Sequence, residues 1–124
     1  MSIESLQYIS EKLNEAGINY EFMQWTNKVV YPYFIGEYQE AESLNEDGLQ
    51  EATFILNGFS KGSWLELEQA KETIEKVFNF TAVILPSGNG LTVFYSGSLV
   101  IPTGDAELKR IQINLAIKEW KVNI

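Results

Sequence analysis

Carboxylate, lysine, tyrosine and serine side chains are those with which this sequence could do chemistry, because it contains neither histidine nor cysteine. Without these two residues there can be no Ser-His-Asp arrangement and no zinc site of the usual nitrogen and sulfur type. Glu37 and Glu51 fall on two strands that we predict to be neighbours, and glycoside hydrolysis uses such a carboxylate pair. Nothing else in the sequence marks a substrate. We therefore expect no enzymatic activity, no cofactor and no bound metal ion.

Six acids with no base between them form the most strongly charged segment of the chain. Asn45 and Gly48 accompany them, but the Asp-x-Asp-x-Asp-Gly order of an EF-hand loop is absent, which argues against calcium. A solvated loop is the simplest interpretation. The functional alternative is a negatively charged channel wall, which repels DNA phosphates and lets DNA pass. The six residues are Glu37, Glu40, Glu42, Glu46, Asp47 and Glu51.

Composition indicates one globular domain over residues 1–124, with 45% hydrophobic residues and a net charge of −8. Residues 1–62 hold ten acids against three lysines, whereas residues 63–124 hold seven acids against six bases. This acidity disfavours ordinary binding to nucleic acid. No apolar run is long enough to span a membrane, and no secretory pattern is present, so we expect synthesis in a cytoplasm and no contact with a membrane.

Two amphipathic helices are predicted from apolar residues that recur every three or four positions. The first covers residues 3–16, with Ser2 as its N-cap and Gly17 closing it in the left-handed conformation. The second covers residues 64–78 and opens with a Ser-x-x-Glu capping box, Ser63 to Glu66.

The remaining segments read as strands, and residues 29–59 form a long hairpin around an acidic loop. Pro32 marks the start or an unpaired edge of its strand, and Gly36 indicates a bulge or a close backbone approach. The order α-β-β-α-β-β-β predicts an α+β fold, with one mixed or antiparallel sheet and both helices on one face. The predicted strands are 29–40, 51–59, 80–85 (short and buried), 91–96 with 99–102 (or one strand broken at Gly97), and 109–121. Residues 18–25 are loosely extended, and 41–50 form the loop.

The last strand has two unlike faces. Four branched residues alternate along it, from Ile111 to Ile117, which predicts that one face is buried. The other face is polar and mildly basic, so a head-to-tail contact with the acidic N-terminal half could close a ring of subunits. A wet sheet face without a partner is the alternative. The polar face carries Arg110, Gln112, Asn114, Ala116 and Lys118.

Aromatic residues are concentrated in the first strand of the hairpin, where Tyr31, Tyr33, Phe34 and Tyr38 occur within eight positions. They are either core residues of a small sheet or a subunit interface, because Tyr and Trp bury large areas at low entropic cost. Residues 32–35 lie near a predicted sheet edge, where strands of two subunits could pair.

The chain resembles the tail terminator (tail completion, head–tail joining) proteins of long-tailed phages and prophages. The resemblance lies in the order of elements and in two stretches, Val-Tyr-Pro-Tyr-Phe-Ile-Gly-Glu-Tyr at 30–38 and Glu-Ala-Thr-Phe-Ile-Leu-Asn-Gly-Phe-Ser at 51–60. The helix that opens at Ser63-Trp64 and the β-rich end complete the pattern. It covers nearly the whole chain but includes no catalytic signature.

The resemblance implies a structural subunit that forms a ring, expected to be a hexamer, which caps the tail tube and joins it to the head. Its partners would be copies of itself, tail-tube proteins and head-connector proteins, with DNA only as passing cargo. Its location would be the virion tail or neck, after assembly in the host cytoplasm. The competing hypothesis is an acidic inhibitor or DNA mimic that binds a basic protein.

Overall fold

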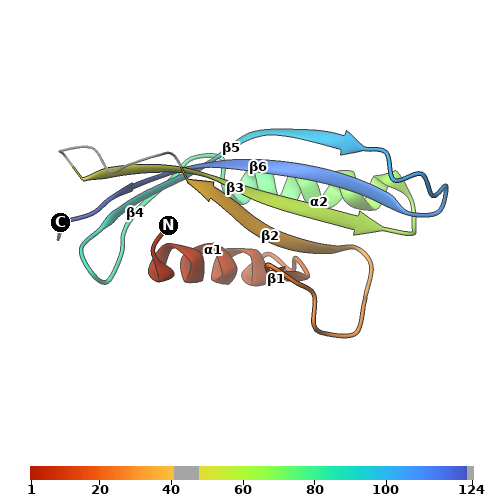
Figure 1. Ribbon diagram of the computed structural model, residues 1–124, viewed down its shortest axis with the longest axis horizontal. Helices are drawn as coiled ribbons and strands as arrows, with labels where there is room; N and C mark the ends of the chain where they lie inside the picture. The colour runs from red at the N-terminus through yellow and green to blue at the C-terminus, as the bar shows by residue number, and fades with distance from the viewer. Residues whose placement is uncertain (41–47, 123–124) are drawn as a thin grey trace.

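The computed structural model describes residues 1–40 and 48–122, which form two helices and a six-stranded mixed sheet (Figure 1). This confirms the predicted α+β class and adds one short strand, β1, within the segment predicted to be loosely extended. The elements are α1 (Ile3–Glu15), β1 (Tyr20–Phe22), β2 (Tyr33–Glu40), β3 (Leu49–Ser60), α2 (Trp64–Val77), β4 (Thr81–Ile84), β5 (Gly90–Ile101) and β6 (Lys109–Trp120).

The strands lie in the order β1-β2-β3-β6-β5-β4. β1 runs parallel to β2, and every other neighbouring pair is antiparallel. The predicted long hairpin is confirmed, because β2 and β3 pair from Tyr33 opposite Phe59 to Glu40 opposite Ala52. The loop was predicted to extend to residue 50, but β3 already begins at Leu49. Residues 41–47 of that loop lie outside the described residues.

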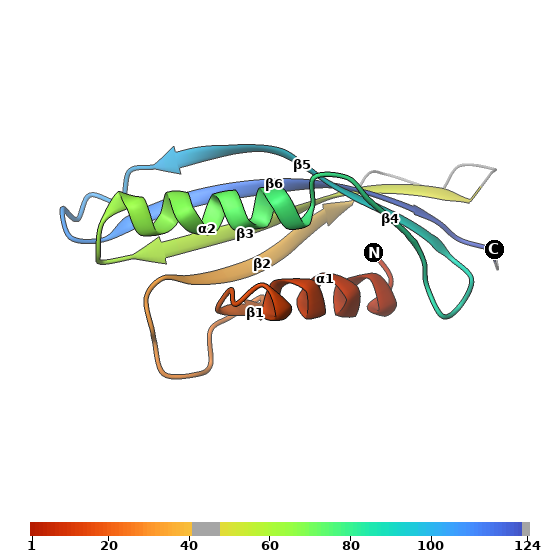
Figure 2. The same cartoon turned by 180° about the vertical axis from the view of Figure 1, so that it is seen from behind.

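One core holds the sheet and both helices together. The alternating side chains of β6 form its centre, since β6 lies between β3 and β5 and its odd-numbered residues from Ile111 to Ile117 are at most 1% exposed. Figure 2 shows α2 lying across β3 and β6. Both helices pack on the same face of the sheet, through Ile9 and Leu13 of α1 and through Leu67, Ala70 and Ile74 of α2.

The two helix starts differ from each other. Ser2 caps α1 as predicted, because its hydroxyl oxygen accepts a hydrogen bond from the Ser5 amide at 3.2 Å, and Gly17 follows α1 with φ +78°. The capping box of α2 was wrong, since the Ser63 side chain makes no cap bond. Glu66 instead accepts a hydrogen bond at 2.8 Å from Ser60, whose buried hydroxyl at the end of β3 needs a partner.

The C-terminal strands resolve one alternative and correct one expectation. β5 is a single strand with a register shift between Tyr95 and Gly97, where Gly97 has φ +141°. The strand predicted over 80–85 was expected to be buried, but Phe80 and Ile84 are 71% and 77% exposed. β4 lies at the edge of the sheet and pairs only with β5, so little packs against it.

Two glycines allow aromatic rings to lie directly against the sheet backbone. A Cβ at Gly36 would lie 2.6 Å from a ring atom of Tyr20, which confirms the close approach predicted there. A Cβ at Gly58 would lie 2.3 Å from the ring of Phe34 on the neighbouring strand. Since Phe34 is buried, its ring has no free space into which to move.

Replacing Gly58 with alanine should therefore destabilise the fold by about 1–3 kcal/mol, because the added methyl group overpacks the core. Urea unfolding measures this loss. Gly90→Ala is the matched control in another strand, since its nearest side-chain atoms lie at an ordinary 3.7 Å, and it should change stability by less than about 1 kcal/mol. Equal losses in the two variants would contradict the close approach of Phe34.

Glu119 is a buried carboxylate that links the end of β6 and the turn between β4 and β5 to the N-cap of α1. Its two oxygens accept hydrogen bonds from the Ser2 amide at 3.0 Å and from the Asn89 side chain at 3.1 Å. Burial alone would raise the pKa of Glu119, but the hydrogen bonds from Ser2, Asn89 and Ser5 outweigh it and hold the pKa below its ordinary value. The charged form therefore stabilises the folded chain.

Glu119→Gln should lower the free energy of unfolding at pH 7 by about 1.5–3 kcal/mol, because a charged acceptor is lost at a buried site. A depressed folded-state pKa contributes stability above the unfolded pKa and loses it as pH falls through the folded value. The difference between variant and wild type should therefore shrink below about pH 4. Denaturation across pH measures it, with the exposed Glu72→Gln as control. A difference that stays constant with pH would contradict the stabilising role of the charge.

Candidate functional site: the open face of the sheet

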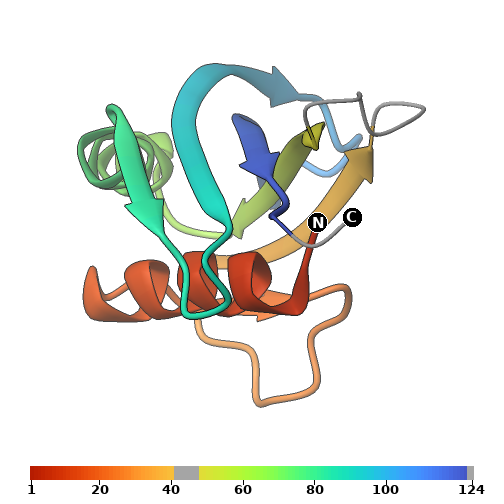
Figure 3. The same ribbon diagram turned by 90° about the vertical axis from the view of Figure 1, so that its left-hand side faces the viewer.

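The face of the sheet opposite α1 and α2 is not covered by any described helix, and we call it the open face. Strand register assigns its residues, because side chains that are paired across neighbouring strands lie on the same side. Viewed along the strands in Figure 3, the sheet is strongly twisted. The open face comprises Tyr33, Ile35, Glu37 and Gln39 of β2, Glu51, Thr53, Ile55, Asn57 and Phe59 of β3, Arg110, Gln112, Asn114, Ala116 and Lys118 of β6, and Thr92, Phe94, Leu99 and Ile101 of β5.

A polar chain crosses the middle of this face. Arg110 Nη2 donates to Asn57 Oδ1 at 2.8 Å, and Asn57 Nδ2 donates to Glu37 Oε1 at 3.4 Å, so one amide links a base on β6 to an acid on β2. Gln112 and Asn114 join each other at 3.1 Å on the same strand. Asn57 is only 8% exposed, which makes it a structural part of the surface.

An aromatic cluster lies beside this polar chain. The Tyr33 ring stacks on Phe59 with centroids 5.2 Å apart and contacts Trp25 and Tyr31 at 4.9 and 5.5 Å. The Arg110 guanidinium lies 5.6 Å above the Phe59 ring. Burial raises the pKa of Tyr33, and the neighbouring Tyr31 adds to that effect. These contacts make a rigid, amphipathic surface of the kind that subunit interfaces favour.

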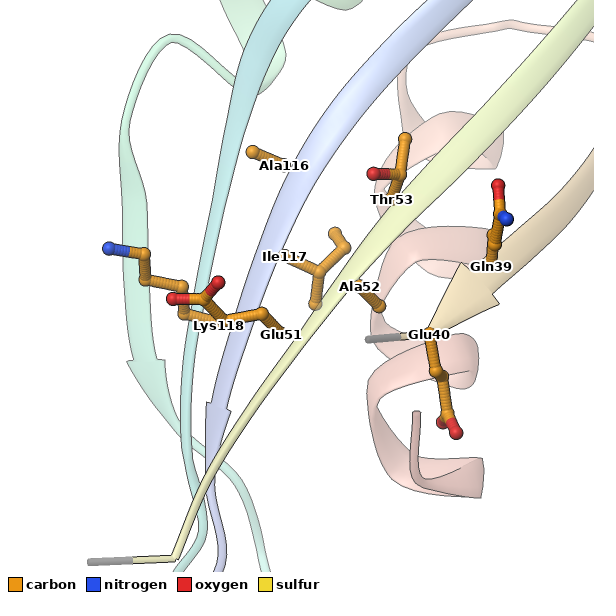
Figure 4. A pocket seen from close by; sticks show the side chains of 8 residues that line it. All are labelled: Gln39, Glu40, Glu51, Ala52, Thr53, Ala116, Ile117 and Lys118. Atoms are coloured by element: carbon orange, nitrogen blue, oxygen red, sulfur yellow. The ribbon is translucent and has the colours of Figure 1, made fainter. Parts of the chain in front are cut away.

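A hollow of about 340 Å³ lies at the other end of the open face (Figure 4). Glu51 and Lys118 are register partners on β3 and β6 and line it together. Glu40 also contributes to its wall, but Figure 4 shows its side chain pointing away from that of Gln39, as alternation along β2 requires. Glu40 forms an ion pair with the Met1 ammonium.

The structure divides the acids predicted to act together. Glu37 and Glu51 share the open face, Glu40 lies on the helix side, and Glu42, Glu46 and Asp47 lie outside the described residues. Glu37 is opposite Ile55, which is four residues along β3 from Glu51. Their backbones are therefore about 13 Å apart along the strand, so the carboxylates reach the ~5–9.5 Å separation of a glycosidase pair only if both side chains lean toward each other.

The predicted interface residues divide in the same way. Tyr33, Arg110, Gln112 and Lys118 lie on the open face, with Tyr31 packed against Tyr33. Tyr38 lies on the helix side and stacks on Phe22 at 6.1 Å. Phe34 is 1% exposed and belongs to the core, so it cannot contact another subunit.

Glu37 and Glu51 lie among the bases of β6 on the open face, so these two acids do not form an acidic surface separate from the basic one. Sequence reasoning also missed the roles of Asn57, Phe59 and Trp25. Alternation along β3 places Asn57 on the same side as Thr53 and Ile55, but it gives no indication of its partners on two other strands.

Within residues 1–40 and 48–122, no group of three or more acids could hold a metal ion. No helix in these segments combines the length and the apolar character needed to cross a membrane. The open face combines stacked aromatic rings with a hydrogen-bonded polar chain, a composition also found in protein interfaces.

Asn57→Ala should destabilise the chain by about 1–3 kcal/mol, because it leaves Arg110 and Glu37 without the amide that joins them. Chemical denaturation measures the loss. Asn114→Ala on the same face removes a more exposed amide with one side-chain partner and should have a smaller effect. If the two variants were equally stable, Asn57 would not hold the polar chain together.

No family model and no curated protein matches the sequence. The fold is similar to that of a chain in a solved structure described as "Virion of native gene transfer agent (GTA) particle". The TM-score is 0.73 at 10% sequence identity, and the match covers 98% of this chain and 100% of that chain. At this identity the likeness concerns the fold.

Proposed function

We propose that this protein is a structural subunit of a phage-type virion and acts as a tail terminator. The observation that carries the proposal is the likeness of its whole fold to a chain of a gene transfer agent virion particle. The likeness spans both chains from end to end, so it includes the arrangement of helices, hairpin and sheet rather than one shared motif. The resemblance of residues 30–38 and 51–60 to tail terminators, drawn from sequence, supports the same role.

The proposed activity is assembly. Copies of the chain form a ring, which we expect to contain six subunits, at the end of the tail tube, and the ring joins the tube to head-connector proteins. DNA passes through the ring without specific contacts, because a chain with a net charge of −8 repels phosphates. The protein would act in the virion neck after assembly in the host cytoplasm.

An acidic inhibitor or DNA mimic is the competing proposal. It would need carboxylates presented together on one surface at a spacing like that of phosphates. Among the described acids of the hairpin, Glu37 and Glu51 lie on one side of the sheet and Glu40 on the other. Glu37 is also engaged by Asn57. This distribution favours assembly over mimicry.

Native mass spectrometry over a concentration series tests the proposed function. The expected result is a closed oligomer whose share rises with protein concentration, and electron microscopy should then show that oligomer at the ends of tail tubes. A chain that stays monomeric at high concentration and low salt, and that does not bind tail tubes, would contradict it. A one-to-one complex with a basic protein would favour the inhibitor.

A further inference from the structure

Two stretches of sheet edge have no strand partner among the described residues, and we call them the open edges. β1 covers β2 only from Phe34 to Gly36, so Glu37–Glu40 are free on that side. β4 covers β5 only from Gly90 to Val93, so Ser96–Ile101 are free on the other side. Figure 1 shows the arrow end of β5 extending without β4 beside it.

The open edge of β5 lacks the lysines and prolines that often prevent edge pairing. A register shift between Tyr95 and Gly97 lies at its start, and the strand continues beyond it to Ile101. Residues 96–101 contain no charge and no proline, and Leu99 and Val100 are 54% and 49% exposed. Free backbone groups beside exposed apolar side chains are a template for another strand.

We propose that the open edge of β5 in one copy pairs with the open edge of β2 in the next, so that the sheet continues from subunit to subunit. This inference rests on the proposed function as a self-assembling subunit. β2 and β5 run in opposite directions within the chain, because three antiparallel steps separate them. Copies in the same orientation therefore meet in an antiparallel pair.

Pairing of unlike edges satisfies both open edges with a single type of contact. Pairing of β5 with β5 would form a two-fold dimer and leave the β2 edge open. Pairing of β2 with β2 would bring Glu37 and Glu40 of both copies together at a repulsive cost. The contact between β5 and β2 places an acidic edge against an uncharged one and avoids that cost.

Side-chain alternation limits the register. Gln39 lies on the open face, and so does Leu99 after the register shift in β5. A pair of Gln39 with Leu99, and therefore of Glu37 with Ile101, joins the open faces of two copies without interruption. A slip by one residue would place the open face of one copy beside the helix side of the next.

This register also produces the stagger that a closed ring needs. Within one chain, the strand register leads from Glu37 of β2 across β3 and β6 to Gly97 of β5, so these two residues lie at the same height along the strands. Pairing Glu37 of the next copy with Ile101 therefore shifts that copy by four residues along the strands. That is a rise of about 13 Å over four strands that span roughly 19 Å. The resulting tilt of about 35° falls at the edge of the range found when sheets close on themselves.

Cysteine cross-linking tests the contact, because the chain has no cysteine of its own. Gln39→Cys and Leu99→Cys proteins are mixed and oxidised gently. Each variant carries a single cysteine, so a disulfide between the two positions can only join two copies. The expected product is a disulfide-linked pair of unlike variants, several-fold above a control mixture of Leu99→Cys with Gln7→Cys, which lies on the exposed side of α1.

A second measurement uses a charge at the edge. Leu99→Lys should reduce assembly in native mass spectrometry at least tenfold, whereas Leu65→Lys, an equally apolar and 63% exposed position on α2, should not. Circular dichroism checks that both variants are folded.

The outcomes separate the two proposals. Oligomers that form without the disulfide between positions 39 and 99 overturn the edge contact but leave self-assembly intact. Dimers of Leu99→Cys alone, at equal yield, overturn it in favour of two-fold pairing. A wild-type chain that remains monomeric at every concentration overturns both.

Discussion

The fold depends on burial of one face of the sheet and only one. β6 supplies the centre of that face, with branched side chains from Ile111 to Ile117 packed against both helices. Two helices of 13 and 14 residues cover that face, and no described helix covers the other. The open face must therefore remain compatible with water or with a partner, and its mixture of amides, charges and stacked aromatics satisfies both conditions.

Periodicity in the sequence was sufficient to predict the elements that contribute most to the core. Both helices, the hairpin and the long last strand follow from where apolar residues recur, because each of these patterns is set by burial on one side. The same reasoning anticipated the close backbone approach at Gly36 and the interruption of β5 at Gly97. It could not find β1, since three residues are too few to show alternation.

The errors have a common physical origin in contacts between residues far apart in the sequence. The capping box failed because Ser60, at the end of β3, takes the carboxylate of Glu66. Phe34, a candidate for either the core or an interface, belongs to the core because it fills the space left by Gly58 on the neighbouring strand. Residues 32–35 were expected near a sheet edge, yet β1 pairs there, so the open edge begins only at Glu37. Each of these outcomes depends on which strands become neighbours, and the local pattern does not record that.

The distribution of charge changes the kind of contact on which assembly can depend. Glu37 and Glu51 lie among Arg110 and Lys118, so the open face is internally balanced and offers little long-range attraction to a second copy. The backbone N–H and C=O groups at the open edges are different from these charges. In the absence of water, only another strand can form hydrogen bonds with them. Each edge contact would involve four to six residues and would be weak alone, since short isolated strand pairs are marginally stable. Ring closure forms one further contact without bringing in another subunit. Under the pairing proposed here, short open edges therefore favour complete rings over partial ones, because a partial ring leaves one edge of each kind exposed to water.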